Sequence, residues 1–174
     1  MQETKNVNIT EPQIVLGIDP GYDRVGVCII SSDRGVDTLM YSTCIMTDKK
    51  MEDYQRVEVV CDELQKIAEE YKPVCAGIET LFVFKNQKTV MGVSEARGAI
   101  KYILNKNKIK IIELTPMQVK SSVCGDGHSH KDQINYMVRN ILKIDMNKKI
   151  IDDEIDAMAI ALTARLFYKN SYII

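Results

Sequence analysis

The chain has 174 residues, of which 45% are hydrophobic and 27% are charged, and its formal net charge is −1. This composition excludes a chain that is disordered throughout, and the length predicts one domain with a substantial core. No apolar run approaches the roughly 20 residues that span a bilayer, and the first dozen residues lack the pattern of a signal or transit peptide. We therefore expect no membrane segment, a flexible leader over residues 1–12 and a single domain over residues 13–170.

Three strands and a helix are expected in the first half of the chain. The apolar run Ile14–Ile18 ends at a Pro-Gly turn, and Arg24–Ile30 resumes with β-branched residues. In Val36–Met46 the β-forming residues alternate, which is typical of a third strand. Residues 51–71 then repeat apolar side chains at steps of three and four, which predicts an amphipathic helix that Pro73 ends.

The second half is expected to alternate between strands and helices. Val74–Ile78 and Lys108–Leu114 have the composition of buried strands, and Thr89–Asn105 between them has a helical apolar stripe. A short helical turn and a Gly-x-Gly loop follow, and a Ser-x-x-Asp capping pattern at residues 129–132 predicts the start of another helix. The stretch Asp153–Tyr168 is strongly helical. This order predicts an α/β sheet layered with helices.

The cysteines and the distribution of charge limit the cellular location and the binding partners that we expect. Five cysteines without a Cys-x-x-Cys pair argue against a disulfide framework and against zinc, and favour a reducing, cytoplasmic location. Residues 80–131 carry nine Lys/Arg and three Asp/Glu, whereas the remainder carries fourteen and twenty-one. Such asymmetry is typical of a surface that binds a polyanion, although a solvated charged surface has the same appearance.

Four acidic residues occupy positions that suggest a shared site. Asp19 and Glu79 are each the first polar residue after an apolar strand, so they meet at one end of the sheet if those strands are neighbours. Asp153 and Asp156 are three residues apart and share a helix face. Converging carboxylates repel one another unless a cation neutralises them, and Mg²⁺ or Mn²⁺ prefers such oxygen ligands. A structural reading stays open for each acid, as a turn residue or a favourable charge at a helix N-terminus.

Five sequence blocks, taken together, resemble the RuvC family of Holliday junction resolvases. In chain order they are GIDPG with a following VG, IETLFVFKN, EARGA, QVKSSVCGDGHSHKDQINYMV and DEIDAMAIAL. The resemblance implies an α/β fold of the RNase H-like type, with a mixed sheet flanked by helices on both faces. It also implies a homodimer that cuts two opposed strands of a four-way DNA junction symmetrically, in recombination and repair. A branch-migration motor complex is a further candidate partner.

The resemblance also assigns roles to individual residues. It implies that two Mg²⁺ ions per subunit, or Mn²⁺ in their place, are bound by the catalytic acids Asp19, Glu79, Asp153 and Asp156. Lys120 and Lys131 match the family's basic active-site residues, where an ammonium group stabilises charge on a phosphate. Phe82 matches an aromatic residue near the crossover and could stack on unpaired bases, with a core position as the alternative. The remaining candidate DNA contacts are Lys85, Lys88, Arg97 and Lys101. For Arg97 and Lys101 a contact with the other subunit stays open, and for Arg97 also a role in helix packing.

Several features depart from the family pattern. The isoelectric point near 6.1 is low for a DNA-binding protein, and Asp126 lies between the two active-site lysines. Asp152 and Glu154 flank Asp153, so only the three-residue spacing to Asp156 selects Asp153.

Two alternative functions stay open. One is another RNase H-like nuclease acting on RNA or branched DNA, such as the YqgF type. The other is a catalytically weak junction-binding protein. A third reading, an ATP-binding domain of the actin and sugar-kinase type, shares the Gly-Ile-Asp opening, but that architecture needs two such domains.

Overall fold

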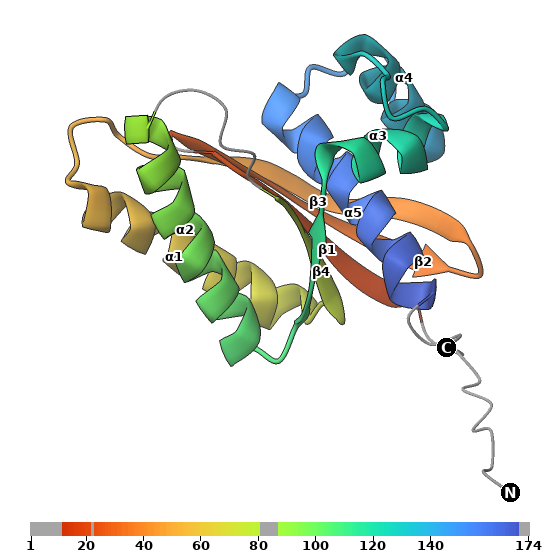
Figure 1. Cartoon of the computed structure of the whole chain (residues 1–174). Helices are drawn as coiled ribbons and strands as arrows, with labels where there is room; N and C mark the ends of the chain where they lie inside the picture. Colours follow the sequence, from red (N-terminus) through yellow and green to blue (C-terminus); the bar gives the residue numbers. More distant parts are fainter. Residues whose placement is uncertain (1–11, 22, 81–86, 171–174) are drawn as a thin grey trace, which may run out of the picture.

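The computed structural model describes residues 12–21, 23–80 and 87–170, so nearly all of the expected leader over residues 1–12 lies outside the described residues. Its centre is a five-stranded sheet with the strand order β3-β2-β1-β4-β5 (Figure 1). The strands are β1 (Gln13–Pro20), β2 (Arg24–Asp33), β3 (Val36–Met46), β4 (Cys75–Glu79) and β5 (Lys110–Leu114). The first three pair antiparallel in sequence, and β4 and β5 run parallel to β1, which makes the sheet mixed.

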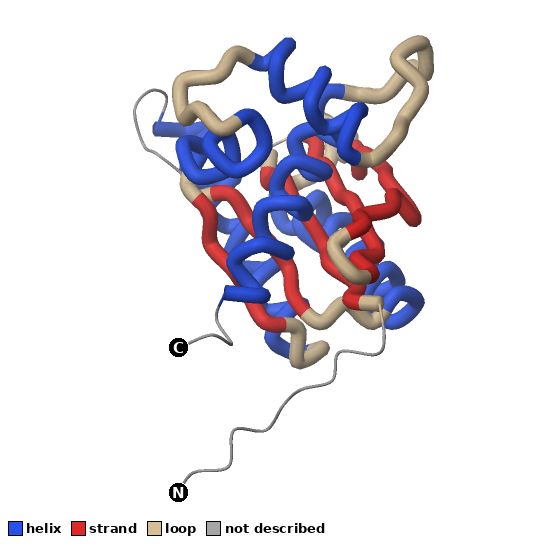
Figure 2. Tube along the Cα trace, turned by 90° about the vertical axis from the view of Figure 1, so that its right-hand side faces the viewer, coloured by secondary structure: helices blue, strands red, loops and turns tan. Residues whose placement is uncertain are grey.

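Helices cover both faces of this sheet, as the sequence predicts. On one face lie α1 (Asp53–Tyr71) and α2 (Gln87–Lys106). On the other face α5 (Asp152–Asn170) runs along the strands, with α3 (Pro116–Cys124) and α4 (Lys131–Ile141) beside it near the start of α5 (Figure 2). Within the described residues, no helix has the length and apolarity needed to cross a membrane.

Alternation along the central strands divides the core into two clusters. Leu16 and Ile18 of β1 point toward α1 and α2, where they pack with Leu64 and its neighbours. Val15 points to the opposite face and packs with Met158 of α5. Because successive residues of a strand point to opposite faces of the sheet, these positions also determine which face the following residues of β1 point to.

Helix α5 lies directly against the backbone of the sheet. A Cβ atom at Gly17 would be 2.0 Å from the carbonyl oxygen of Ala157, and one at Gly26 would be 1.9 Å from the carbonyl oxygen of Asp153. These are distances that no side chain tolerates, so glycine is required at both positions. The close approach places the first turn of α5 immediately over the ends of β1 and β2.

Some element boundaries differ from the sequence prediction for local reasons. The expected helical turn after Thr115 is the nine-residue helix α3, which has Pro116 in its first turn and is capped by hydrogen bonds between Thr115 and Gln118. Strand β5 begins two residues later than expected, because Lys108 adopts a left-handed φ of 58°.

The capping prediction for α4 is wrong by one residue. Ser129 does not cap the helix, because its hydroxyl donates to the carbonyl oxygen of Asp126 at 2.8 Å. The N-cap is His130, whose backbone N–H donates to the side chain of Gln133 at 2.8 Å. The helix therefore starts at Lys131, which fixes where that lysine points.

Candidate active site

Asp19 and Glu79 lie side by side at the carboxyl ends of two inner strands of the sheet. Strands β1 and β4 are parallel neighbours, as expected, and Ile18 pairs with Ile78, so the two acids follow at the same level. Ile18 and Ile78 both point into the cluster under α1 and α2. Alternation therefore turns Asp19 and Glu79 to the opposite face, toward α5.

The start of α5 supplies the remaining acids. The side chain of Asp153 is only 17% exposed, and the guanidinium of Arg24 at the start of β2 lies 3.5 Å from its Oδ2. Asp156 lies one turn further, with its Oδ2 3.3 Å from the ammonium of Lys131. Of the flanking acids, Asp152 contacts the same Lys131 from the surface, whereas Glu154 turns away and accepts a hydrogen bond from Ser42 of β3.

The grouping of the acids has a marked effect on the pKa of Asp19. Burial, followed by the charges of Asp156, Glu79 and Asp153, raises the pKa of Asp19 from 3.8 to about 7, and Lys131 opposes the shift only in part. The acids therefore act on one another although they come from three elements of the chain. At neutral pH they hold more negative charge than the protein itself stabilises.

The same imbalance affects Glu79 and Asp156. The pKa of Glu79 is raised by burial and by Asp156, while Lys120 and Arg97 lower it. Burial raises the pKa of Asp156 against the opposing effect of Lys131. The two lysines thus face the acidic group from α3 and α4 and neutralise part of its charge.

The donor chemistry of this group fits a hard divalent cation. The buried Oδ2 of Asp153 has no hydrogen-bond partner among the described residues, and the ligands available are carboxylate oxygens. In the part of the chain that is described, no three acidic, histidine or cysteine side chains stand close enough to hold an ion as they are. A cation bound among the carboxylates would offset their mutual repulsion.

A cavity of about 250 Å³ opens beside the acids. One side is polar and the other apolar, and it has room for several water molecules. Its polar lining is formed by Glu79, Lys120, Lys131 and Asp156, and its apolar lining by Pro116, Val119, Ile134, Ala159 and Ile160. The two lysines that the sequence singles out therefore border the same space as two of the acids.

Sequence reasoning missed the side chains that hold the loops around this site. Arg139 is buried in α4 and donates to the carbonyl oxygens of Asp145 and Lys148 at 2.7 and 3.0 Å, in the loop that leads into α5. Arg24 was missed as the partner of Asp153. An arginine next to the apolar stripe of an amphipathic helix is the signal that marks Arg139, whereas nothing in the sequence identifies its partners.

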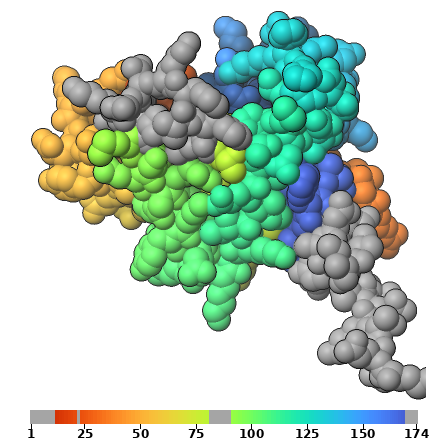
Figure 3. Space-filling model, in the orientation of Figure 1, coloured from red at the N-terminus to blue at the C-terminus, as the bar shows by residue number. Residues whose placement is uncertain are grey.

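The predicted DNA contacts are only partly described. Phe82 and Lys85 lie outside the described residues, and Lys88 belongs to α2 but its side chain is also outside them. Arg97 and Lys101 of α2 both pair with Glu113 of β5, and the guanidinium of Arg97 lies 3.6 Å from one carboxylate oxygen. The basic segment from α2 to α4 occupies much of the face in Figure 3. A DNA-binding role for these residues stays a prediction.

The strand order, with helices on both faces and acids at the ends of the central strands, defines an RNase H-like α/β protein with a carboxylate site. The family model described as crossover junction endodeoxyribonuclease RuvC matches residues 15–164. A crossover junction endodeoxyribonuclease RuvC of Fusobacterium nucleatum subsp. nucleatum is 41% identical over 149 residues, 86% of this chain and 78% of that protein. Its counterpart in Thermosipho melanesiensis is 37% identical over 147 residues, 84% of this chain and 93% of that protein. The chain belongs to the RuvC family.

Solved structures confirm the fold. The Thermus thermophilus RuvC structure superposes with a TM-score of 0.84 at 24% identity, covering 92% of this chain and 98% of the other. T. thermophilus RuvC in complex with Holliday junction substrate gives a TM-score of 0.85 at 24% identity, over 92% and 97% of the two chains. The RNase H-like mixed sheet and the family resemblance expected from the sequence are therefore both confirmed.

Proposed function

We propose that this chain is an endodeoxyribonuclease that resolves four-way DNA junctions in recombination and repair. One observation supports this most strongly: Asp19 and Glu79 end two parallel neighbouring strands beneath the two acids of α5, in a chain of the RuvC family. The similar proteins from F. nucleatum and T. melanesiensis carry the name of this activity. The reaction is hydrolysis of a phosphodiester, with water as the nucleophile.

The RuvC family is metal-dependent, and we assign the metal ligands to Asp19, Glu79, Asp153 and Asp156. Their oxygen donors suit Mg²⁺, with Mn²⁺ as a substitute, and four carboxylates suffice for two ions per subunit. When bound, two such ions activate water and stabilise the leaving oxygen of a phosphodiester.

The chain's own residues complete the site. The ammonium of Lys131 lies at the mouth of the cavity, where a phosphate could take the place of Asp152 and Asp156 as its partner. Lys120 borders the same cavity from α3. Both can stabilise negative charge that develops on a phosphate during the reaction.

The partners follow from the geometry of the substrate. One subunit provides one group of acids, so two simultaneous and symmetric cuts require a homodimer. Phe82, Lys85, Lys88, Arg97 and Lys101 are assigned to the junction, with Phe82 stacking on unpaired bases. A branch-migration motor complex would deliver the junction. The five cysteines are free thiols, which suits a cytoplasmic enzyme.

The test is cleavage of end-labelled synthetic four-way junctions, with linear duplex and RNA–DNA hybrid alongside, in Mg²⁺, Mn²⁺ or EDTA. We expect paired nicks that need metal and are confined to the junction. Asp19→Asn should bind the junction without cutting it. Asp33→Asn, an exposed acid at the opposite end of β2, should cut normally. Cutting of hybrid or linear substrates would favour the other nuclease class, and wild-type binding without cutting would favour a junction-binding protein.

A further inference from the structure

Arg56 is a buried cation on the face of the sheet opposite α5. Its side chain is 7% exposed and lies in the first turn of α1, in phase with the apolar stripe of Val60 and Leu64. Burying a guanidinium is costly unless its donors are paired. An arginine in this position therefore needs a reason that packing does not supply.

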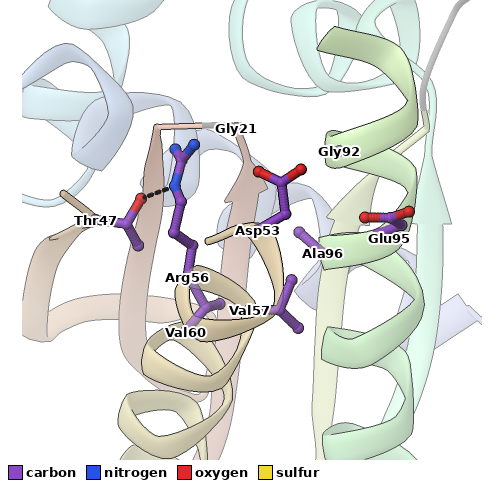
Figure 4. A pocket seen from close by; sticks show the side chains of 9 residues that line it. All are labelled: Gly21, Thr47, Asp53, Arg56, Val57, Val60, Gly92, Glu95 and Ala96. Carbon is purple, nitrogen blue, oxygen red and sulfur yellow. Dashed lines mark hydrogen bonds between the residues drawn. The ribbon is translucent and has the colours of Figure 1, made fainter. Parts of the chain in front are cut away.

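Its partners are two loops that come from different parts of the chain. Arg56 donates from Nε to the hydroxyl of Thr47 at 2.9 Å and from Nη2 to Oδ1 of Asp23 at 2.7 Å. Thr47 in turn donates its backbone N–H to the carbonyl oxygen of Asp23 at 3.2 Å. Figure 4 shows the side chain reaching from α1 toward the β1–β2 turn, with the hydrogen bond to Thr47. We call this group of Asp23, Thr47 and Arg56 the turn clamp.

The turn held by the clamp joins two parts of the candidate active site. It follows Pro20 at the end of β1, one residue after Asp19, and leads into Arg24 at the start of β2, whose guanidinium pairs with Asp153. Asp23, the residue that Arg56 grips, is directly bonded to Arg24 in the chain. A shift of Asp23 would therefore move Arg24, the cation that pairs with Asp153, and would reach Asp19 through the pairing of β1 with β2.

Packing alone does not fix the turn from this side. A small cavity lies beneath it between α1 and α2, with room for about one water molecule. Gly21, Thr47, Arg56 and Ala96 are among its lining residues (Figure 4). Since part of the space behind the turn is unfilled, polar contacts set its position, namely the buried hydrogen bonds of Arg56 and the exposed ion pair between Lys49 and Asp23 at 3.0 Å.

We propose that Arg56, through the turn clamp, is a positioning residue for the metal-binding acids. It acts through Asp23 on the neighbouring Arg24, and so on Asp153, and touches neither substrate nor metal. This inference rests on the proposed function, because it assigns Arg56 a role toward the metal ligands named there. Partners that orient metal ligands typically change metal affinity 10- to 100-fold when lost, and we expect a loss of about 10-fold here.

The test uses the full chain and measures Mn²⁺ affinity by electron paramagnetic resonance, together with unfolding in urea and junction cleavage as a function of metal concentration. Arg56→Lys keeps the charge but loses the two-pronged donation, and Asp23→Asn removes the acceptor charge while leaving Arg56 in place. Both should bind Mn²⁺ about 10-fold more weakly. High metal concentration should restore most of their cleavage rate.

The matched control is Arg165→Lys. Arg165 makes an ion pair of the same length, 2.7 Å, with Asp37, but at the opposite end of the sheet. This variant should lose stability with its Mn²⁺ affinity unchanged. Unchanged Mn²⁺ affinity in Arg56→Lys and Asp23→Asn, or an equal loss in Arg165→Lys, would overturn the positioning role. Wild-type protein that binds Mn²⁺ but leaves junctions uncut would instead contradict the proposed function, and wild-type protein without Mn²⁺ binding would overturn both.

Discussion

Replacing Asp19 with asparagine is expected to stabilise the metal-free protein while abolishing cleavage. Asparagine keeps the shape of the side chain but removes the negative charge that the site stabilises poorly. The pKa of Asp19 is raised from 3.8 to about 7, first by burial and then by Asp156, Glu79 and Asp153. At 1.36 kcal/mol for each pKa unit, this difference corresponds to about 4 kcal/mol as an upper limit. Because the neighbouring acids can take up protons in its place, we expect a gain of about 2 to 4 kcal/mol.

The pH dependence has a definite sign. The raised pKa means that the folded protein keeps the Asp19 proton at a pH where the unfolded chain has lost it. The wild-type contribution is therefore favourable toward low pH and is lost as pH rises from about 4 to about 7. The advantage of Asp19→Asn should be near zero at pH 4 and complete at pH 8. Divalent metal should reverse the order, because it binds the folded wild type and adds to its stability.

Urea denaturation in EDTA at pH 5 and pH 8, repeated in Mn²⁺, measures these differences. Asp33→Asn serves as the control, since that exposed acid lies far from the site and should leave the free energy of unfolding unchanged at each pH. Asp19→Asn protein that is no more stable than the wild type at pH 8 in EDTA would refute the reasoning. It would mean that neither burial nor the neighbouring acids disfavour the charged form of Asp19 in the folded state.

Three further substitutions test separate parts of the structure. Gly26→Ala places a Cβ atom 1.9 Å from the carbonyl oxygen of Asp153, so α5 must move. We expect the free energy of unfolding in urea to fall by about 1 to 3 kcal/mol and cleavage to be lost. A variant as active as the wild type would contradict the close contact. Lys131→Gln removes the ammonium that contacts Asp152 and Asp156. It should lower the junction cleavage rate about 100-fold, while junction binding in gel-shift assays is retained. Equal losses of cleavage and binding would assign Lys131 to binding alone. Phe82→Ala should cut junctions poorly while its Mn²⁺ affinity stays at the wild-type value, and unchanged cutting would remove Phe82 from the site.

The layered fold and the proximity of Asp19 to Glu79 could be predicted because the residues that end a strand can be recognised from the local sequence. An apolar run followed by one acid is visible without knowing which strands are neighbours. The parallel pairing of β1 with β4, which brings the acids together, is then the simplest arrangement for this order of elements. The glycines at positions 17 and 26 were part of the recognised motif, although their purpose, the close approach of α5, emerged only from the structure.

Pairings between distant residues were beyond sequence reasoning. Arg97 and Lys101 were expected to contact DNA or the other subunit, which stays a prediction, and their pairing with Glu113 of the adjacent strand β5 was not foreseen. Arg56 donates a hydrogen bond to Asp23, which lies 33 residues earlier in the chain. In the sequence, only the position of Arg56 within an apolar stripe is unusual. The capping error at Ser129 has the same origin, since the competing acceptor in the preceding loop decides where the hydroxyl points.

Crystals of the protein soaked in Mn²⁺ would test most directly whether the four acids form the metal site. Anomalous scattering locates the ions independently of any assumption about the ligands. We predict peaks enclosed by Asp19, Glu79, Asp153 and Asp156, with Lys131 drawn away from Asp156. Peaks at other residues only, or four acids that remain apart and bind no ion at saturating Mn²⁺, would contradict a metal-dependent nuclease site at this end of the sheet.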